Sequence, residues 1–277
     1  AKQYRSSFAY KNGITNAFLC SFYRVATLGS GSGVAAIIYL GEHGIEYGGG
    51  FGLYMIQYAL HKISIALFSA IFFVMNWEFM RNWFGDYAGL LAAGYALTLV
   101  ITLGLFLFCC SNRFHHLICR LLDFANQKFH GKFEIMAEEI KRQCMMLEDA
   151  SNHLMKNKKV TTEVIFLCLL KCCFWYGIPY LLFKGVQFQG NPALSLSQVL
   201  AITSLSVMLA AVIPSPAGIG STEFVFTTLF AGIVGTGIAG SASLLYRFGT
   251  FVFPFLVGAV VVLVRHFKRK KLSSGSI

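Results

Sequence analysis

The chain has 277 residues, of which 56% are hydrophobic and 13% are charged, and its mean hydropathy is +0.63. These proportions exclude an ordinary soluble domain and indicate a protein that crosses the membrane several times. A net charge of +11 could suit a nucleic-acid-binding protein, but the basic residues cluster beside apolar runs. That placement favours positive-inside topology and contact with anionic lipids, so we expect a multi-pass protein of the cell membrane and no nucleic-acid partner.

No pattern typical of a metal centre, a cofactor site or a common catalytic site occurs in the sequence. The eight cysteines mostly lie in or beside apolar runs and lack the paired C-x-x-C spacing of a zinc site. There is no nucleophile elbow, no H-E-x-x-H pair, no phosphate-binding P-loop and no glycine-rich dinucleotide turn. We therefore predict no metal, no cofactor and no enzymatic activity.

Residues 1–110 form the first predicted membrane half. The apolar run Ile14–Leu40 is interrupted at Gly29–Gly33, which leaves pieces of about fifteen and seven residues, whereas a spanning helix needs roughly 20. This favours a re-entrant hairpin entering from the cytoplasm, with a single kinked span as the alternative. Full spans are predicted at Phe51–Met75 and Tyr87–Cys110, joined by a connector with interfacial tryptophans that we expect to face outside.

Residues 111–159 form a predicted cytoplasmic connector. This stretch carries nine Lys and Arg residues, and its apolar residues recur at helical spacing in two runs. The pattern predicts two amphipathic helices, docked on the membrane surface or on each other. A partner-binding role is the alternative to a solvated connector.

Residues 160–277 form the second predicted membrane half, which ends in the basic, cytoplasmic tail RHFKRKK. A short uncharged outer loop, QFQGNPAL, follows its first span. The predicted apolar segments are, in order, Val160–Val186, Leu194–Ile213, Ser221 to about Ser241, and Ser243–Val264.

A break of seven residues separates the second and third of these segments. It contains two prolines and two glycines: Pro214, Pro216, Gly218 and Gly220. Lipid offers no partner to a free N–H or C=O group, so broken backbone at membrane depth must be buried by protein or line a wet cavity. A helix restarting near Ser221 would have Glu223 in its first turn and would point its positive dipole end into the break, where it can receive an anion.

The motifs around this break resemble those of a known family. IPSPAGIGSTEF resembles the P-x-x-x-G-x-G-x-x-E signature of the lysylphosphatidylglycerol synthase transmembrane family, also described as flippase-like integral membrane proteins. SLLYRFGTFVFPFLVGAVVVL resembles that family's last conserved helix, with Arg247 near its start and Pro254 midway. FYRVATLGSGSGVAAIIYLGEHGI is similar to the family's other break, but it lacks the proline before the glycines and the polar residue with proline after them.

The resemblance implies a lipid flippase or transporter, which moves a phospholipid or a polyprenyl-phosphate-linked lipid between leaflets. It also implies at least one further spanning helix before residue 1, no soluble aminoacyl-transferase domain in this chain, and a separate synthase as a possible partner. The alternatives are a membrane-embedded transferase that modifies lipids and an accessory subunit that binds lipid without transporting it. A homo-oligomer is compatible with each.

We expect an all-α polytopic bundle in which two re-entrant or broken helices meet near the bilayer centre, and the two breaks suggest an inverted arrangement of the two halves. If Ile14–Leu40 enters from the cytoplasm and Leu194–Ser241 from outside, the basic ends and the loop assignments agree. Interrupted segments in corresponding positions of opposed halves indicate a binding site near the middle of the membrane in transporters. Two full spans on either side of Pro214 are the alternative.

Five ionisable residues within apolar runs are candidates for this site: Arg24, His61, Lys62, Lys171 and Arg247. An Arg or Lys at membrane depth costs about 2.5–3.5 kcal/mol on insertion scales, so each should face a cavity or pair. We favour pairing of Arg247 with Glu223, because both match the family motif and an arginine that exchanges carboxylate for phosphate can bind a headgroup. The alternative is a fixed ion pair that only holds the hairpin.

The remaining candidates differ in their expected roles. Arg24 can face the same cavity or snorkel to the cytoplasmic surface. His61 and Lys62 point about 100° apart on a helix, and Lys62 is the predicted phosphate partner while His61 is predicted to be a satisfied core residue. Lys171 is left open. The predicted substrate-binding residues are Arg24, Gly31, Gly33, Lys62, Pro214, Gly218, Gly220, Ser221, Glu223 and Arg247.

Overall fold

The structure is a computed structural model that describes residues 1, 4–85, 87–128, 134–155, 157–185 and 194–274. All regular elements in this part of the chain are helices, which confirms the predicted all-α fold. The α-helices are α1 (Tyr10–Ala26), α2 (Gly31–Glu42), α3 (Tyr47–Met75), α4 (Trp77–Phe84), α5 (Tyr87–Cys110), α6 (Asn112–Lys128), α7 (Glu134–Met155), α8 (Lys158–Gly185), α9 (Leu196–Ala210), α10 (Ser221–Val234), α11 (Thr236–Arg247) and α12 (Phe253–Ser274). A 3-10 turn, η1 (Pro216–Gly218), precedes α10, and a π-helical turn, η2 (Phe248–Val252), precedes α12.

Five helical stretches among the described residues are long and apolar enough to cross a membrane. They are Tyr47–Met75, Tyr87–Cys110, Lys158–Gly185, Pro216–Val234 and Thr236–Lys268. The chain is therefore a multi-pass membrane protein. The fourth stretch contains the non-helical residue Ala217, so its unbroken part is α10 alone.

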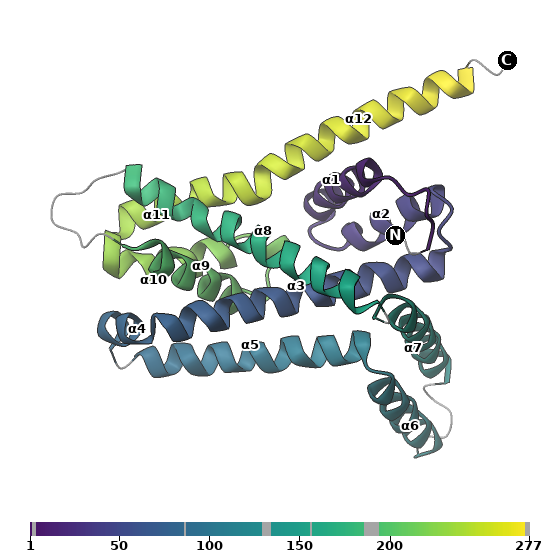
Figure 1. Cartoon of the computed structure of the whole chain (residues 1–277), viewed down its shortest axis with the longest axis horizontal. Coiled ribbons are helices and arrows are strands. Elements are labelled where there is room, and N and C mark those ends of the chain that lie inside the picture. Colours follow the sequence, from purple (N-terminus) through teal and green to yellow (C-terminus); the bar gives the residue numbers. More distant parts are fainter. Residues whose placement is uncertain (2–3, 86, 129–133, 156, 186–193, 275–277) are drawn as a thin grey trace.

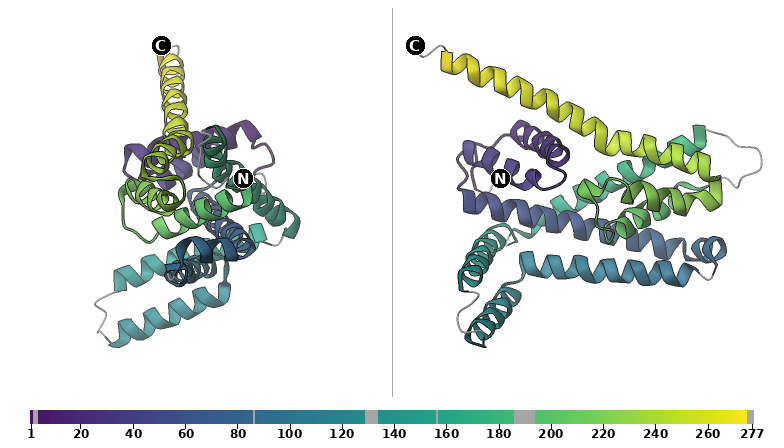
Figure 2. Two further views of the ribbon diagram at one scale, coloured as in Figure 1. Left: turned by 90° about the vertical axis from the view of Figure 1, so that its left-hand side faces the viewer. Right: turned by 180° about the vertical axis from the view of Figure 1, so that it is seen from behind.

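The molecule is elongated, and its long helices run along its length (Figure 1). Helix α3 lies at the centre of the bundle, where it contacts α2, α5, α7, α8 and α9. Helix α12 packs along α1 and then extends beyond the bundle (Figures 1 and 2). The N-terminus, the end of α12 and the α6–α7 pair lie at one end of the molecule, and α4 lies at the other.

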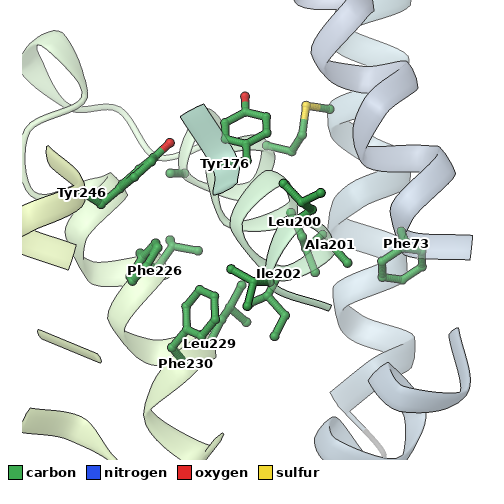
Figure 3. Close-up of a cluster of buried hydrophobic side chains, with 14 of the residues drawn as sticks. Phe73, Tyr176, Leu200, Ala201, Ile202, Phe226, Leu229, Phe230 and Tyr246 are labelled. Carbon is green, nitrogen blue, oxygen red and sulfur yellow. The ribbon is translucent and has the colours of Figure 1, made fainter. Parts of the chain in front are cut away.

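The largest core cluster surrounds α9. This helix is buried along most of its length, including its polar residues Thr203, Ser204 and Ser206. Figure 3 shows the middle of α9 between α3 on one side and the phenylalanines of α10 on the other. A capping box starts the helix, because the Ser195 hydroxyl accepts from the Gln198 N–H at 3.2 Å and the Gln198 side chain accepts from the Ser195 N–H at 2.8 Å.

Two helical hairpins, α1–α2 and α9–α10, lie in opposite halves of the molecule (Figure 1). Their helices have 17, 12, 15 and 14 residues in chain order. At about 1.5 Å per residue, even the longest reaches only about 25 Å, whereas the hydrocarbon core is about 30 Å thick. Each of these helices is therefore too short to span the membrane alone without tilting or thinning it.

Some predicted boundaries are wrong. The sequence predicts a helix from Ser221 to about Ser241, but α10 ends at Val234, because Gly235 adopts a φ of 82° and starts α11 as its N-cap. The final apolar helix therefore begins before the predicted Ser243 and runs on through η2 into α12. In the first hairpin, the second helix is longer than the predicted piece, because it begins within the glycine-rich segment and continues to Glu42.

Both predicted amphipathic helices of the connector are present as α6 and α7. They pack on each other, and α7 also packs on α3 and α5. An ion pair between Lys141 of α7 and Asp123 of α6 joins them. The predicted outer loop lies outside the described residues except for Leu194.

Candidate functional site: the junction of two broken helices

The second break joins α9 to α10 through left-handed backbone. Ala217 has a φ of 54° and Gly218 a φ of 76°, both inside or beside the turn η1. Gly220, the N-cap of α10, has a φ of 85°. Left-handed backbone costs a residue with a side chain about 1–2 kcal/mol, so glycine suits two of these positions and Ala217 adopts the conformation against its preference.

Side chains of α10 satisfy the polar backbone of this break. The Glu223 carboxylate accepts a hydrogen bond from the Gly220 N–H at 2.9 Å, as the third residue of a capping box does. The Thr222 hydroxyl donates to the Gly218 carbonyl at 3.1 Å. Protein groups thus provide the hydrogen bonds that lipid cannot.

Arg247 ties α11 to the same break. Its Nε donates to Glu223 Oε1 at 2.7 Å, and its Nη2 donates to the Gly218 carbonyl at 3.1 Å. The side chains of Arg247 and Glu223 are 12% and 27% exposed, so the pair is largely shielded from its surroundings. The favoured pairing of these two residues is therefore present, and Arg247 is occupied by protein on two of its nitrogen atoms.

The first break, between α1 and α2, repeats the local pattern of the second. Residues 28–32 read L-G-S-G-S and residues 217–221 read A-G-I-G-S. In both, a left-handed residue with a side chain precedes a left-handed glycine, since Leu28 has a φ of 54° and Gly29 a φ of 112°. A new helix starts within each motif, at Gly31 in the first and at Ser221 in the second.

The two breaks touch each other. A Cβ atom placed on Gly29 would lie 3.4 Å from the Ala217 nitrogen and 3.6 Å from its Cα. The left-handed residue of one motif thus lies against the left-handed glycine of the other. The structure therefore brings the two interrupted segments to one junction, although they are far apart in the sequence.

The ring of Phe251 contacts two arginine side chains beside this junction. The Arg247 guanidinium carbon lies 4.2 Å from the centre of its ring, and the Arg24 guanidinium carbon lies 5.9 Å from the same centre. Phe251 belongs to the π-helical turn η2, a kind of irregularity that often occurs at functional sites. Pro254 follows the turn, and its missing N–H removes a regular helical hydrogen bond there.

Three cations of the membrane helices have no acidic partner within the described part of the chain: Arg24, Lys62 and Lys171. Lys62 and Lys171 contact aromatic rings instead, with Nζ 5.5 Å from the centre of Tyr58 and 4.2 Å from the centre of Trp175. Both lysines and Arg247 are close enough to Arg24 for their positive charges to repel it. Arg24, Lys62 and Lys171 therefore form a group of like charges that has no ion-pair partner among the described residues.

His61 lies beside this group and is not the satisfied core residue predicted. Its Nδ1 atom is buried and has no hydrogen-bond partner among the described residues. The charges of Lys171, Lys62 and Arg24 all reach its ring. An unsatisfied buried nitrogen next to three cations is suited to a ligand atom that can pair with it.

A groove of about 810 Å³ opens between the start of α1, α3 and α8. Its walls are mostly apolar and include Leu53, Leu60 and Val164. His61 and Lys171 also line it, and so does Glu163, which lies where α8 begins. Since Glu163 and Lys171 are eight residues apart on one helix, about 12 Å separates them along its axis.

The other predicted site residues have structural roles in the two breaks. The Gly31 N–H donates to the Thr27 hydroxyl at 2.6 Å, and a Cβ atom on Gly33 would lie 3.0 Å from the Tyr54 ring. The Ser221 hydroxyl shares a 2.6 Å hydrogen bond with that of Ser215 across the second break. Pro214 is exposed at the start of the break.

Sequence reasoning missed Phe251 and Tyr58, whose rings contact the cations. Phe251 follows Arg247 by four residues, which is the spacing at which helical side chains meet, so this contact had a sequence signal. The contact of Phe251 with Arg24 had none, because it depends on how α1 packs on α12.

Comparison with known proteins gives one result. The sequence profile of the family described as "Lysylphosphatidylglycerol synthase TM region" matches residues 4–258. This range contains both breaks and all of the candidate cations. The searches of curated proteins and of solved structures give no match.

Proposed function

Because the chain belongs to the lysylphosphatidylglycerol synthase TM-region family, we propose that it moves a lipid with an anionic headgroup, a phospholipid or a polyprenyl-phosphate-linked lipid, between the two leaflets. The observation that carries the proposal is the junction itself. Two broken hairpins meet at Gly29 and Ala217, and Arg24 stands beside them without an acidic partner in the described chain. Broken helices that meet around a charged group are typical of binding sites in transporters.

The proposed mechanism is replacement of water around the headgroup. Helices α2 and α10 start at the junction, and their N-termini direct positive dipole ends toward an anion there. Arg24, Lys62 and Lys171 add formal charge, while the acyl chains stay in lipid. The barrier to crossing falls because the headgroup charge is never exposed to hydrocarbon.

The proposed orientation places the basic end of the molecule in the cytoplasm. The N-terminus, α6–α7 and the end of α12 share one end (Figure 1), and these segments carry many of the Lys and Arg residues. The positive-inside rule assigns such an end to the cytoplasm. The α1–α2 hairpin would then enter from the cytoplasm and the α9–α10 hairpin from the outside.

The test is movement of fluorescent lipids in liposomes that contain the purified protein. NBD-labelled phospholipid in both leaflets is reduced by dithionite added outside, so a protein that moves lipid exposes the inner pool as well. We expect fast loss of the inner pool with the parent protein and slow loss with Arg24→Gln. Arg81→Gln, an exposed arginine of α4, is the matched control and should behave like the parent.

Two outcomes would contradict the proposal. If correctly folded parent protein and empty liposomes behave alike for phospholipid and polyprenyl-phosphate probes, passive transport fails and a lipid-binding accessory role replaces it. If the protein instead converts the labelled lipid into a new product, detected by chromatography of the extracted lipids, it is a transferase.

A further inference from the structure

The charges of the membrane helices do not balance. Helices α8 to α12 contain only two acidic residues, Glu163 and Glu223, and only Glu223 lies at the junction of the breaks. Its carboxylate is already shared by Arg247 and the Gly220 N–H. Arg24, Lys62 and Lys171 thus leave the site with three positive charges that no described acidic group offsets.

Such an excess is costly unless a ligand compensates it. Like charges in a poorly hydrated site repel one another, and each cation loses hydration that only a counter-charge or hydrogen-bond acceptor can replace. The aromatic contacts of Lys62 and Lys171 compensate this loss only in part, since a ring face is a weak partner beside an anion. The site is therefore incomplete without an anion of more than one charge.

The groove beside these cations has the form of a lipid site. Its walls are mostly apolar and include Leu53, Leu60 and Val164, and the basic side chains that line it are Lys171 and His61. Glu163 also lines the groove, but about 12 Å from Lys171 along α8. A free phosphate ion would use only the basic residues, whereas an amphiphile fits the whole groove, with its chain along the apolar residues and its headgroup against Lys171.

We propose that the cargo ends in a phosphate monoester or a diphosphate, so that its headgroup carries about two negative charges near neutral pH. This inference rests on the proposed transport function and narrows its substrate class. A singly charged phosphodiester such as phosphatidylglycerol would leave two of the three cations unmatched. A headgroup esterified with lysine carries a net positive charge and would be repelled by Arg24, Lys62 and Lys171.

Transport selectivity tests the proposal directly. We would compare NBD-labelled phosphatidic acid, phosphatidylglycerol and lysylphosphatidylglycerol with identical acyl chains in liposomes containing the full chain. Phosphatidic acid should move fastest, and lysylphosphatidylglycerol should move at least about tenfold more slowly, since each charged hydrogen bond gained or lost changes binding by about that factor. Equal rates for phosphatidic acid and phosphatidylglycerol, or fastest movement of the lysyl lipid, would overturn the proposal while leaving transport itself established.

Substitutions identify the residues that set this preference. The double variant Lys62→Gln/Lys171→Gln should lose the preference for phosphatidic acid over phosphatidylglycerol. Lys184→Gln, which removes an exposed lysine from the last turn of α8, is the control and should keep it. Retention of the preference in the double variant would show that these lysines do not read the headgroup.

A binding measurement separates failure of the substrate inference from failure of the transport function. In a Trp77→Phe/Trp83→Phe background, Trp175 is the remaining tryptophan and contacts Lys171. Its fluorescence should respond to dihexanoyl phosphatidic acid at concentrations at least about tenfold lower than to dihexanoyl phosphatidylglycerol or inorganic pyrophosphate. If no lipid moves but this order holds, transport fails and the headgroup inference stands. If pyrophosphate binds as tightly as the lipid, the site serves a free phosphate, and the lipid inference is overturned.

Discussion

At the residue scale, two arginines share one aromatic ring but differ in what they hold. Arg247 donates to Glu223 and to the Gly218 carbonyl, so it fastens α11 to the second break. Arg24 reaches the same Phe251 ring without an acidic partner in the described residues. The first arginine therefore serves mainly the fold, and the second is available to a ligand.

Lys62, like Arg24, has no ion-pair partner among the described residues, so substitutions of the paired Arg247 and of Lys62 should affect stability in different ways. Arg247→Gln should lower the free energy of unfolding by about 2 kcal/mol, because it leaves the shielded Glu223 carboxylate without its cation. Lys62→Gln should leave it unchanged or raise it, because it removes a repelled charge. Thermal unfolding in detergent, followed by size-exclusion chromatography, measures both. Equal destabilisation by the two changes would mean that Lys62 has a structural partner.

At the element scale, a close contact at one glycine determines how near α1 of the first hairpin packs to α12. A Cβ atom on Gly258 of α12 would lie 2.9 Å from Phe22 Cβ of α1 and would collide with the Phe18 carbonyl oxygen. The rings of Phe22 and Phe255 stack 5.4 Å apart with an interplanar angle of 3°. Small residues at such contacts let two membrane helices approach closely.

We expect Gly258→Leu to separate α1 from α12 and to destabilise the protein by about 1–3 kcal/mol, the usual cost of overpacking. It should also weaken lipid movement, because α1 carries Arg24 to the junction. Gly104→Leu in α5 is the control, since a Cβ atom there meets nothing within 4 Å. A Gly258→Leu protein with parental stability and transport would contradict the importance of this contact.

The connector helices offer a further check of helix packing. Cys144 of α7 is buried, and burial raises the pKa of its thiol. Because the thiolate is the reactive form, a raised pKa lowers the reactive fraction at every pH below it. In a variant that keeps only Cys144, we expect maleimide at pH 7.5 to label the native protein at least about tenfold more slowly than the protein in dodecyl sulfate. Equal rates would show that α7 is not packed as described.

At the scale of the whole molecule, the composition and the positions of proline and glycine predicted the membrane fold and its breaks. The contacts between segments that are far apart in the sequence could not be predicted. The high apolar content predicted the polytopic fold, and the prolines and glycines from Pro214 to Gly220 predicted the second break. No local pattern predicted that Gly29 would touch Ala217, because that contact depends on how complete hairpins dock. The end of α10 was mispredicted because Gly235 interrupts a run whose hydropathy does not change.

The proposed orientation gives a prediction at this scale. Single cysteines introduced at Lys268 near the end of α12 and at Asn112 at the start of α6 should both be labelled by an impermeant maleimide only from the cytoplasmic side. A cysteine at Arg81 in α4 should be labelled only from outside, because α4 lies at the opposite end of the molecule (Figure 1). Labelling of all three from one side would overturn the assignment.

The burial of α9 has a consequence for biogenesis. Helix α9 has 15 residues, too few to span the bilayer, and its hydroxyl groups are buried by neighbouring helices. Its insertion into lipid should therefore be unfavourable until those neighbours are present. The long helices α3, α5 and α8 precede it in the chain and can insert first, whereas α10, which covers its other side, is made only afterwards. We therefore expect α9 to take its place only after the surrounding helices have inserted, so that its packing is the last step in assembly of the bundle.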